Sequence, residues 1–87
     1  NPEVLALIRS VKANFERLAK LKKGIPQEVL DALKDMEDPE RVSDTLVGKL
    51  DLKLEKKQQF LEEPSPLIRL EMLLENIQAE IEIIHVE

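Results

Sequence analysis

The 87-residue sequence predicts an all-α protein, a small bundle of about five helices that ends in a long helix. Three observations point to this class. Apolar residues recur every three or four positions through most of the chain, which is the period of one face of a helix. Pro and Gly interrupt this pattern at positions typical of helix starts and stops. The composition, with 43% hydrophobic and 36% charged residues and no Tyr or Trp, is typical of a helical domain with a charged surface.

The first predicted helix begins at Pro2, because Pro suits the first helical position. Gly24 follows three lysines and predicts that the helix ends there, with the glycine in the left-handed backbone conformation. Between them, apolar residues spaced by 4, 3, 4 and 3 positions define one face, namely Val4, Ile8, Val11, Phe15 and Leu18.

The second and third helices are predicted from Pro26 and from Asp38-Pro39-Glu40, where Asp is the N-cap and Pro the first helical residue. The second helix is expected to bury Val29, Leu30, Leu33 and Met36. The third is expected to bury Val42, Leu46 and Leu50.

Residues 50–54 alternate between leucine and charged residues, which predicts an extended connector with Leu50, Leu52 and Leu54 on one side. If Leu52 is fully buried, its replacement by Ala is expected to cost about 2–5 kcal/mol of stability. A short fourth helix is predicted over roughly Glu55–Glu63. Leu54, Gln58 and Leu61 are expected on one side of this helix, with Phe60 beside them.

The last helix is predicted over about residues 66–87, with Ser65 as its N-cap. A heptad seam with spacings of 3, 4, 3, 4 and 3 runs along it, formed by Leu67, Leu70, Leu74, Ile77, Ile81 and Ile84. No Gly, Asn or Pro lies near Glu87, so we expect the helix to continue beyond the last residue in a longer parent protein.

The same helix carries more apolar residues than one stripe requires, since Leu73 and others stand outside the seam. Either the other helices of this chain cover this surplus, or a neighbouring domain or subunit does. We take as the candidate apolar interaction surface Leu67, Ile68, Met72, Ile83 and Val86.

The sequence offers no catalytic, cofactor-binding or metal-binding residues. It has no Cys, one His and two Gly, which excludes thiolate chemistry, a zinc site built from several histidines and a glycine-rich phosphate loop. His85 lacks a partner for metal binding, so it is better interpreted as a residue flanking the seam. The net charge of −5 disfavours nucleic acid as a partner, and no apolar run approaches the roughly 18 residues of a membrane span.

The net negative charge lies almost wholly at the end of the chain. Residues 64–87 hold five acidic residues and a single base, Arg69, whereas residues 1–49 hold nine of each sign. The last helix is therefore predicted to be both apolar and acidic.

Four motifs occur in a fixed order along the chain. They are Lys22-Lys23 before Ile25-Pro26-Gln27-Glu28-Val29-Leu30, Asp38-Pro39-x-Arg41-Val42-x-Asp44, Leu50-x-Leu52-Lys53-Leu54-x-x-Lys57-Gln58-x-x-Leu61-Glu62 before Arg69-Leu70, and Glu80-Ile81-Glu82-Ile83-Ile84-x-Val86-Glu87. Together they resemble the helical half of the N-terminal domain of the ATP-dependent Lon protease family. The family-motif positions are Pro26, Pro39, Asp44, Leu50, Leu52, Leu54, Gln58, Leu61, Glu62, Arg69 and Leu70. Departures include Asp51, where many members have Pro, and the prolines Pro64 and Pro66.

The resemblance implies that residues 1–87 are one non-catalytic helical subdomain of a larger serine protease. In the family, an AAA+ ATPase module, which needs ATP and Mg, and a protease domain with a Ser-Lys dyad follow this region, and the parent forms a homo-oligomeric ring. The resemblance implies a role in engaging unfolded or damaged protein substrates and in contacts between subunits. It favours the bacterial cytoplasm, with the mitochondrial matrix as the alternative. A stand-alone helical adaptor or oligomerisation module, which pairs its last helix with a partner, is the competing hypothesis.

Overall fold

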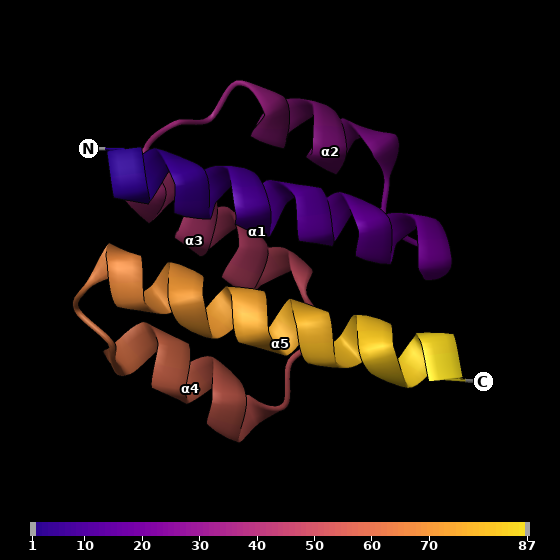
Figure 1. Ribbon diagram of the computed structural model, residues 1–87. Helices are drawn as coiled ribbons and strands as arrows, with labels where there is room; N and C mark the ends of the chain where they lie inside the picture. The colour runs from indigo at the N-terminus through magenta and orange to yellow at the C-terminus, as the bar shows by residue number, and fades with distance from the viewer. Residues whose placement is uncertain (1, 87) are drawn as a thin grey trace.

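A computed structural model of the chain describes residues 2–86, apart from the side chains of residues 85 and 86. The described residues form five α-helices and no strand, which confirms the predicted all-α class (Figure 1). The helices are α1 (Pro2–Leu21), α2 (Gln27–Lys34), α3 (Pro39–Lys49), α4 (Leu54–Glu62) and α5 (Pro66–Val86).

The two long helices, α1 and α5, lie side by side and run in the same direction (Figure 1). Helix α3 packs behind them and closes the core, so α5 contacts both α1 and α3 extensively. The two short helices are peripheral, with α2 beside α1 and α4 beside α5. The position of α5 is therefore set mainly by α1 and α3, two segments distant from it in sequence.

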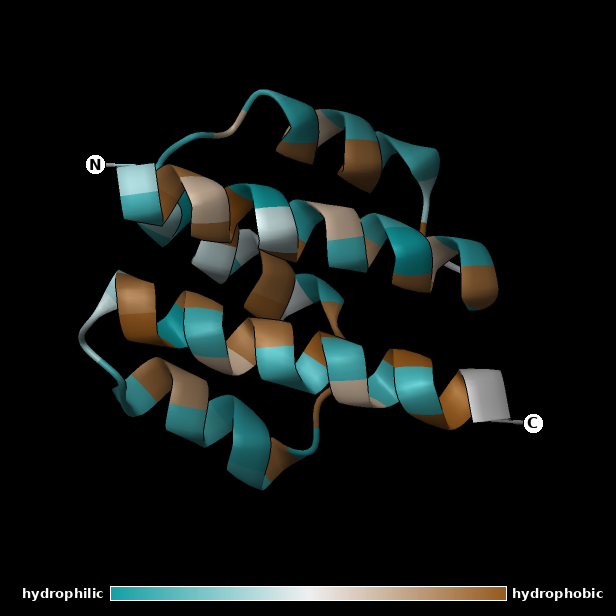
Figure 2. Cartoon of the chain, in the orientation of Figure 1, coloured by the Kyte–Doolittle hydropathy of each residue, from teal (hydrophilic) through white to brown (hydrophobic). Residues whose placement is uncertain are grey.

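The core face of α1 follows the predicted spacing. Ile8, Val11, Phe15 and Leu18 are all buried, and Val4 packs against them from the first turn. In α2, Val29 and Leu33 are buried while Leu30 and Met36 are partly buried. Figure 2 shows the same pattern, with hydrophobic residues of α2 directed towards α1.

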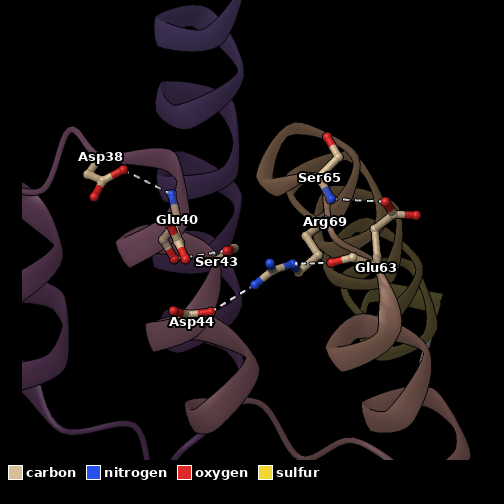
Figure 3. Close-up of polar contacts among 7 residues, drawn as sticks. All are labelled: Asp38, Glu40, Ser43, Asp44, Glu63, Ser65 and Arg69. Atoms are coloured by element: carbon tan, nitrogen blue, oxygen red, sulfur yellow. Dashed lines mark hydrogen bonds and ion pairs between the residues drawn. The ribbon is translucent and has the colours of Figure 1, made fainter.

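Local capping chemistry sets the helix ends as predicted. The Asp38 carboxylate accepts a hydrogen bond of 3.2 Å from the Glu40 amide at the start of α3 (Figure 3). The Ser65 hydroxyl accepts one of 3.3 Å from the Ile68 amide at the start of α5. Gly24 has a φ of 108°, a backbone conformation that favours glycine, and so reverses the chain after α1.

Helix α4 packs through Phe60 and not through the side that Leu54, Gln58 and Leu61 share. Leu54 and Leu61 are 71% and 68% exposed, and the buried residue of α4 is Phe60, which is fully enclosed. At about 100° per residue, Leu54 and Leu61 both point more than about 90° away from Phe60 and on the same side. A peripheral helix buries only one face, and the largest apolar side chain of α4 occupies it.

The connector before α4 also differs from the prediction. Leu50 is buried, Leu52 is half-buried, and Leu54 already belongs to the first turn of α4. The three leucines therefore do not share one side, because the chain becomes helical before the alternation ends.

The seam predicted for α5 is rotated in the structure. The buried residues are Leu70, Leu73, Ile77 and Ile81, with spacings of 3, 4 and 4, whereas Leu67 is 37% exposed. Leu74 and Ile84 are half-buried at the edge of this face. The observed spacing keeps close to the 3.6-residue period of a straight helix packed in a globular core, rather than the 3.5-residue period of a coiled coil.

Candidate interaction surface on the last helix

Helix α5 is apolar on two opposite sides. Its core side faces α1 and α3, and a second stripe is formed by Ile68, Met72, Ala79 and Ile83. These residues are spaced by 4, 7 and 4 positions, so they share one face of the helix. At about 100° per residue, the centre of this outer stripe lies roughly half a turn away from that of the buried residues. The four residues are called the outer stripe below.

The outer stripe is accessible along most of its length. Ile68 is 44% and Ile83 is 71% exposed, and Ala79 is exposed as well. Met72 is half-buried and lines a shallow depression of about 330 Å³ with Lys56, Glu75, Asn76 and Ala79. The candidate residue Leu67 lies outside the stripe, towards the core side, and the side chain of Val86 lies outside the described part of the chain.

A buried guanidinium fixes the first turns of α5, where Ile68 lies. Arg69 Nη1 is 2.9 Å from Asp44 Oδ1 of α3, and Arg69 Nε donates a 2.8 Å hydrogen bond to the Glu63 carbonyl oxygen (Figure 3). The Arg69 side chain is only 14% exposed. The Ser65 amide donates to Glu63 Oε2 at 3.0 Å, which ties down the same connection. These bonds hold α3, the end of α4 and the start of α5 together, so the stripe is presented on a fixed element.

Arg69 and Asp44 are both family-motif positions, and their pairing was missed by reasoning from sequence. They lie 25 residues apart, and no helical spacing relates them. The only signal was that Arg69 is the single base of residues 64–87 and that both residues lie within family motifs. The structure brings these two positions together at the junction of three helices.

The remaining family-motif positions fall into two groups. Some support the fold, since Leu50 and Leu70 are buried, Leu52 is half-buried, and Pro26 and Pro39 lie at the starts of α2 and α3. The others lie on the surface of α4, namely Leu54, Gln58, Leu61 and Glu62. Leu54, Gln58 and Leu61 are spaced by 4 and 3 positions, so they form a second exposed face, called the α4 face below.

A hollow of about 400 Å³ lies between α1 and α2. It mixes apolar residues such as Leu5 and Ile8 with charges of both signs. Lys12 reaches across it, and its ammonium donates to the main-chain carbonyl oxygens of Met36 and, at 3.3 Å, Lys34. Lys12 therefore connects α1, across this hollow, to the end of α2 and the segment after it.

The described residues contain no group of three or more His, Cys, Asp or Glu side chains placed to hold a metal ion. Within the same part of the chain, none of the helices has the length and hydropathy that a bilayer span requires. The His85 side chain lies outside the described residues. The described surface does carry exposed apolar area, on the outer stripe and on the α4 face.

Comparison of the sequence with known proteins finds one family and several relatives that bear the same name. Residues 2–79 match the family described as the ATP-dependent protease La (LON) substrate-binding domain. The chain is 51% identical to Lon protease 1 of Myxococcus xanthus over 82 residues, covering 94% of this chain and 10% of that protein. It is 41% identical to the Lon protease of Escherichia coli K12 over 81 residues, or 93% of this chain and 10% of that protein. It is 46% identical to Lon protease 3 of Sorangium cellulosum over 80 residues, or 91% and 10%. The chain thus spans about a tenth of the length of these relatives.

Proposed function

Because the chain belongs to the family of LON substrate-binding domains, we propose that it binds unfolded or damaged protein clients for a Lon-type protease through the outer stripe of α5. The observation that carries this proposal is the exposure of aliphatic side chains on that stripe, with Ile83 71% and Ile68 44% exposed. Unfolded proteins expose aliphatic side chains that folded proteins bury. A stripe of this kind therefore favours unfolded clients over folded ones.

The energetics of the stripe suit transient binding. Covering an aliphatic side chain contributes about 25 cal/mol for each Å² of apolar surface removed from water. Only three large side chains, Ile68, Met72 and Ile83, offer such area, and Met72 is already half-buried. Association also costs translational and rotational freedom, so a few partly exposed side chains give weak binding. Weak binding allows a client segment to be captured and then passed on.

The parent protein is proposed to resemble its relatives in the regions outside this chain. On this proposal it is an ATP-dependent serine endopeptidase whose AAA+ module uses ATP and Mg and whose Ser-Lys dyad cleaves the client. The 87 residues of this chain would supply no catalytic group and no cofactor ligand, and would work in the cytoplasm of a bacterium. The relatives named Lon protease support this proposal.

A second role, in organising the oligomeric ring, is proposed for the α4 face. Leu54 and Leu61 are 71% and 68% exposed on a helix whose buried residue is Phe60. Exposed leucines two helical turns apart are typical of a helix that packs against another surface. Gel filtration with light scattering of the full-length parent would test this role, because Leu54→Gln with Leu61→Gln should weaken the ring. An unchanged assembly would contradict it.

The competing proposal is a stand-alone adaptor that pairs α5 with a helix of a partner. The gene distinguishes the two. A stop codon directly after Glu87 would favour the adaptor. Several hundred further codons that include a GxxxxGK[ST] motif would favour the protease.

The client-binding proposal is tested by measuring the affinity of the chain for a fluorescently labelled, permanently unfolded protein. The double variant Ile68→Ser with Ile83→Ser should bind at least about tenfold more weakly, since it removes the two most exposed aliphatic side chains of the stripe. The matched control is Leu5→Ser with Leu21→Ser, which changes two leucines of α1 that are each 41% exposed. Circular dichroism checks that both variants stay folded. Equal losses in both variants, or no loss in either, would overturn the assignment to the outer stripe.

A further inference from the structure

The outer stripe has an acidic border on one side. Glu71, Glu75 and Glu82 are all exposed and are spaced by 4 and 7 positions, so they follow one edge of the stripe along α5. Among the described residues of α5, Arg69 is the only base, and it is engaged with Asp44. The fourth glutamate, Glu80, is on the other side and lies 3.7 Å from Lys22.

Other residues of this chain leave the acidic border largely unneutralised. Two bases face this region from neighbouring helices, since Lys56 of α4 shares a depression with Glu75 and Arg17 of α1 shares one with Glu82. Within the described part of the chain, neither base comes within 4.0 Å of these carboxylates, and Glu71 has no basic neighbour at that distance either. The three carboxylates are therefore available to a ligand.

We propose that the outer stripe selects client segments that carry lysine or arginine along one side of an aliphatic stripe. This inference rests on the proposed function and names the class of client. The reason is charge complementarity, because a cationic side chain beside the apolar contact would meet Glu71, Glu75 or Glu82. The stripe covers 16 residues of α5, from Ile68 to Ile83, or about 22 Å, so it matches an amphipathic helix of about four turns.

A second copy of α5 is a poorer occupant of the same stripe. In an antiparallel pair of such helices the two acidic borders would lie on the same side of the contact, where like charges disfavour it. In a parallel pair the described part of the partner α5 would offer the border no free base, because Arg69 is engaged with Asp44. A segment with acidic side chains beside its apolar stripe is disfavoured for the same reason. The charge pattern thus favours a basic client segment over a second copy of α5 and over an acidic segment.

The test uses two labelled 18-residue helical peptides with the same aliphatic stripe, one with Lys and one with Glu along its edge. Fluorescence anisotropy measures their affinity for the full 87-residue chain. Three exposed ion pairs predict that the Lys peptide binds roughly five- to thirtyfold more tightly than the Glu peptide. The preference should largely disappear in 1 M salt, where the Debye length is about 3 Å.

Two triple variants with the same net charge identify the residues responsible. Glu71→Gln, Glu75→Gln and Glu82→Gln together should abolish the preference for the Lys peptide. The control, which should keep it, changes three exposed acids on α1, on α2 and after α2, namely Glu16→Gln, Glu28→Gln and Glu37→Gln.

Each remaining outcome decides between the hypotheses. Equal binding of both peptides would overturn the charge selection and leave the proposed function standing. Binding of neither peptide would overturn the proposed function of the stripe together with the selection. Equal loss in the two triple variants would assign the preference to net charge alone. Self-association of the chain that Ile68→Ser abolishes would make a second copy the occupant, against this inference.

Discussion

Replacement of Phe60 by Ala is expected to lower the free energy of unfolding by about 3 kcal/mol and to release α4 before the other helices. Phe60 is fully buried and is the buried residue of α4, so it is the main anchor of that helix. Removal of a buried Phe side chain typically costs about 3–5 kcal/mol, because apolar contacts are lost and a cavity remains. The higher helix propensity of Ala returns roughly 0.5 kcal/mol.

The effect is large compared with the stability of a domain of this size. Domains of this length unfold with roughly 4–13 kcal/mol, so the variant should remain folded with a melting temperature about 12–24 °C lower. Urea denaturation followed by circular dichroism at 222 nm measures the loss of stability. Amide hydrogen exchange should show that α4 loses protection while α1, α3 and α5 retain theirs. If the domain proves too unstable, Phe60→Leu gives a milder change of about 1–1.5 kcal/mol in the same direction.

The matched control is Leu61→Ala, which shortens the next side chain on the same helix. Leu61 is 68% exposed, so its replacement should change stability by no more than about 0.5 kcal/mol. A larger loss at Leu61 than at Phe60 would refute the reasoning, because it would mean that α4 packs through the face predicted from sequence. A loss below about 1 kcal/mol at Phe60 would refute it as well.

Three further predictions are checked in the same urea assay, two of them on pairs of variants. Gly24→Ala should destabilise the domain by about 1 kcal/mol because Gly24 has a φ of 108°. Gly48→Ala should stabilise it by about 0.5–1 kcal/mol, because Gly48 lies in α3 and nothing lies within 4 Å of the added Cβ. Effects of the same sign would contradict this account. Arg69→Leu should cost about 1.5–3 kcal/mol of stability, because it removes the bonds of a largely buried side chain to Asp44 and to the Glu63 carbonyl oxygen. Asp44→Asn should cost less than about 1 kcal/mol, because the Asp44 side chain is 61% exposed. Equal costs would count against this account. Leu52→Ala should cost less than about 2 kcal/mol, since Leu52 is only half-buried, and a loss of 3 kcal/mol would show that it is enclosed in solution.

The sequence alone determined the features that depend on neighbouring residues. The fold class, the five helices, the cap at Asp38, the stop at Gly24 and the start of α5 at Ser65 all follow from contacts within four residues. The family resemblance likewise follows from residue order, and the comparisons confirm it. Of the candidate interaction surface, the presence of surplus apolar residues on the last helix was predictable, because it is a property of composition and spacing.

Only the tertiary structure decided which face of α4 and of α5 is buried. Both α4 and α5 carry apolar residues on more than one side, so periodicity offers two solutions for each. In α4 the structure encloses Phe60 and leaves Leu61 exposed, and in α5 it buries Leu73 within the core face and leaves Ile83 outside. For α5 the choice depends on α1 and α3, which approach from distant parts of the chain, and on the bond between Arg69 and the Glu63 carbonyl oxygen. For a helix with apolar residues on more than one side, the buried face depends on what the rest of the chain brings alongside it, and the spacing of residues within the helix does not specify it.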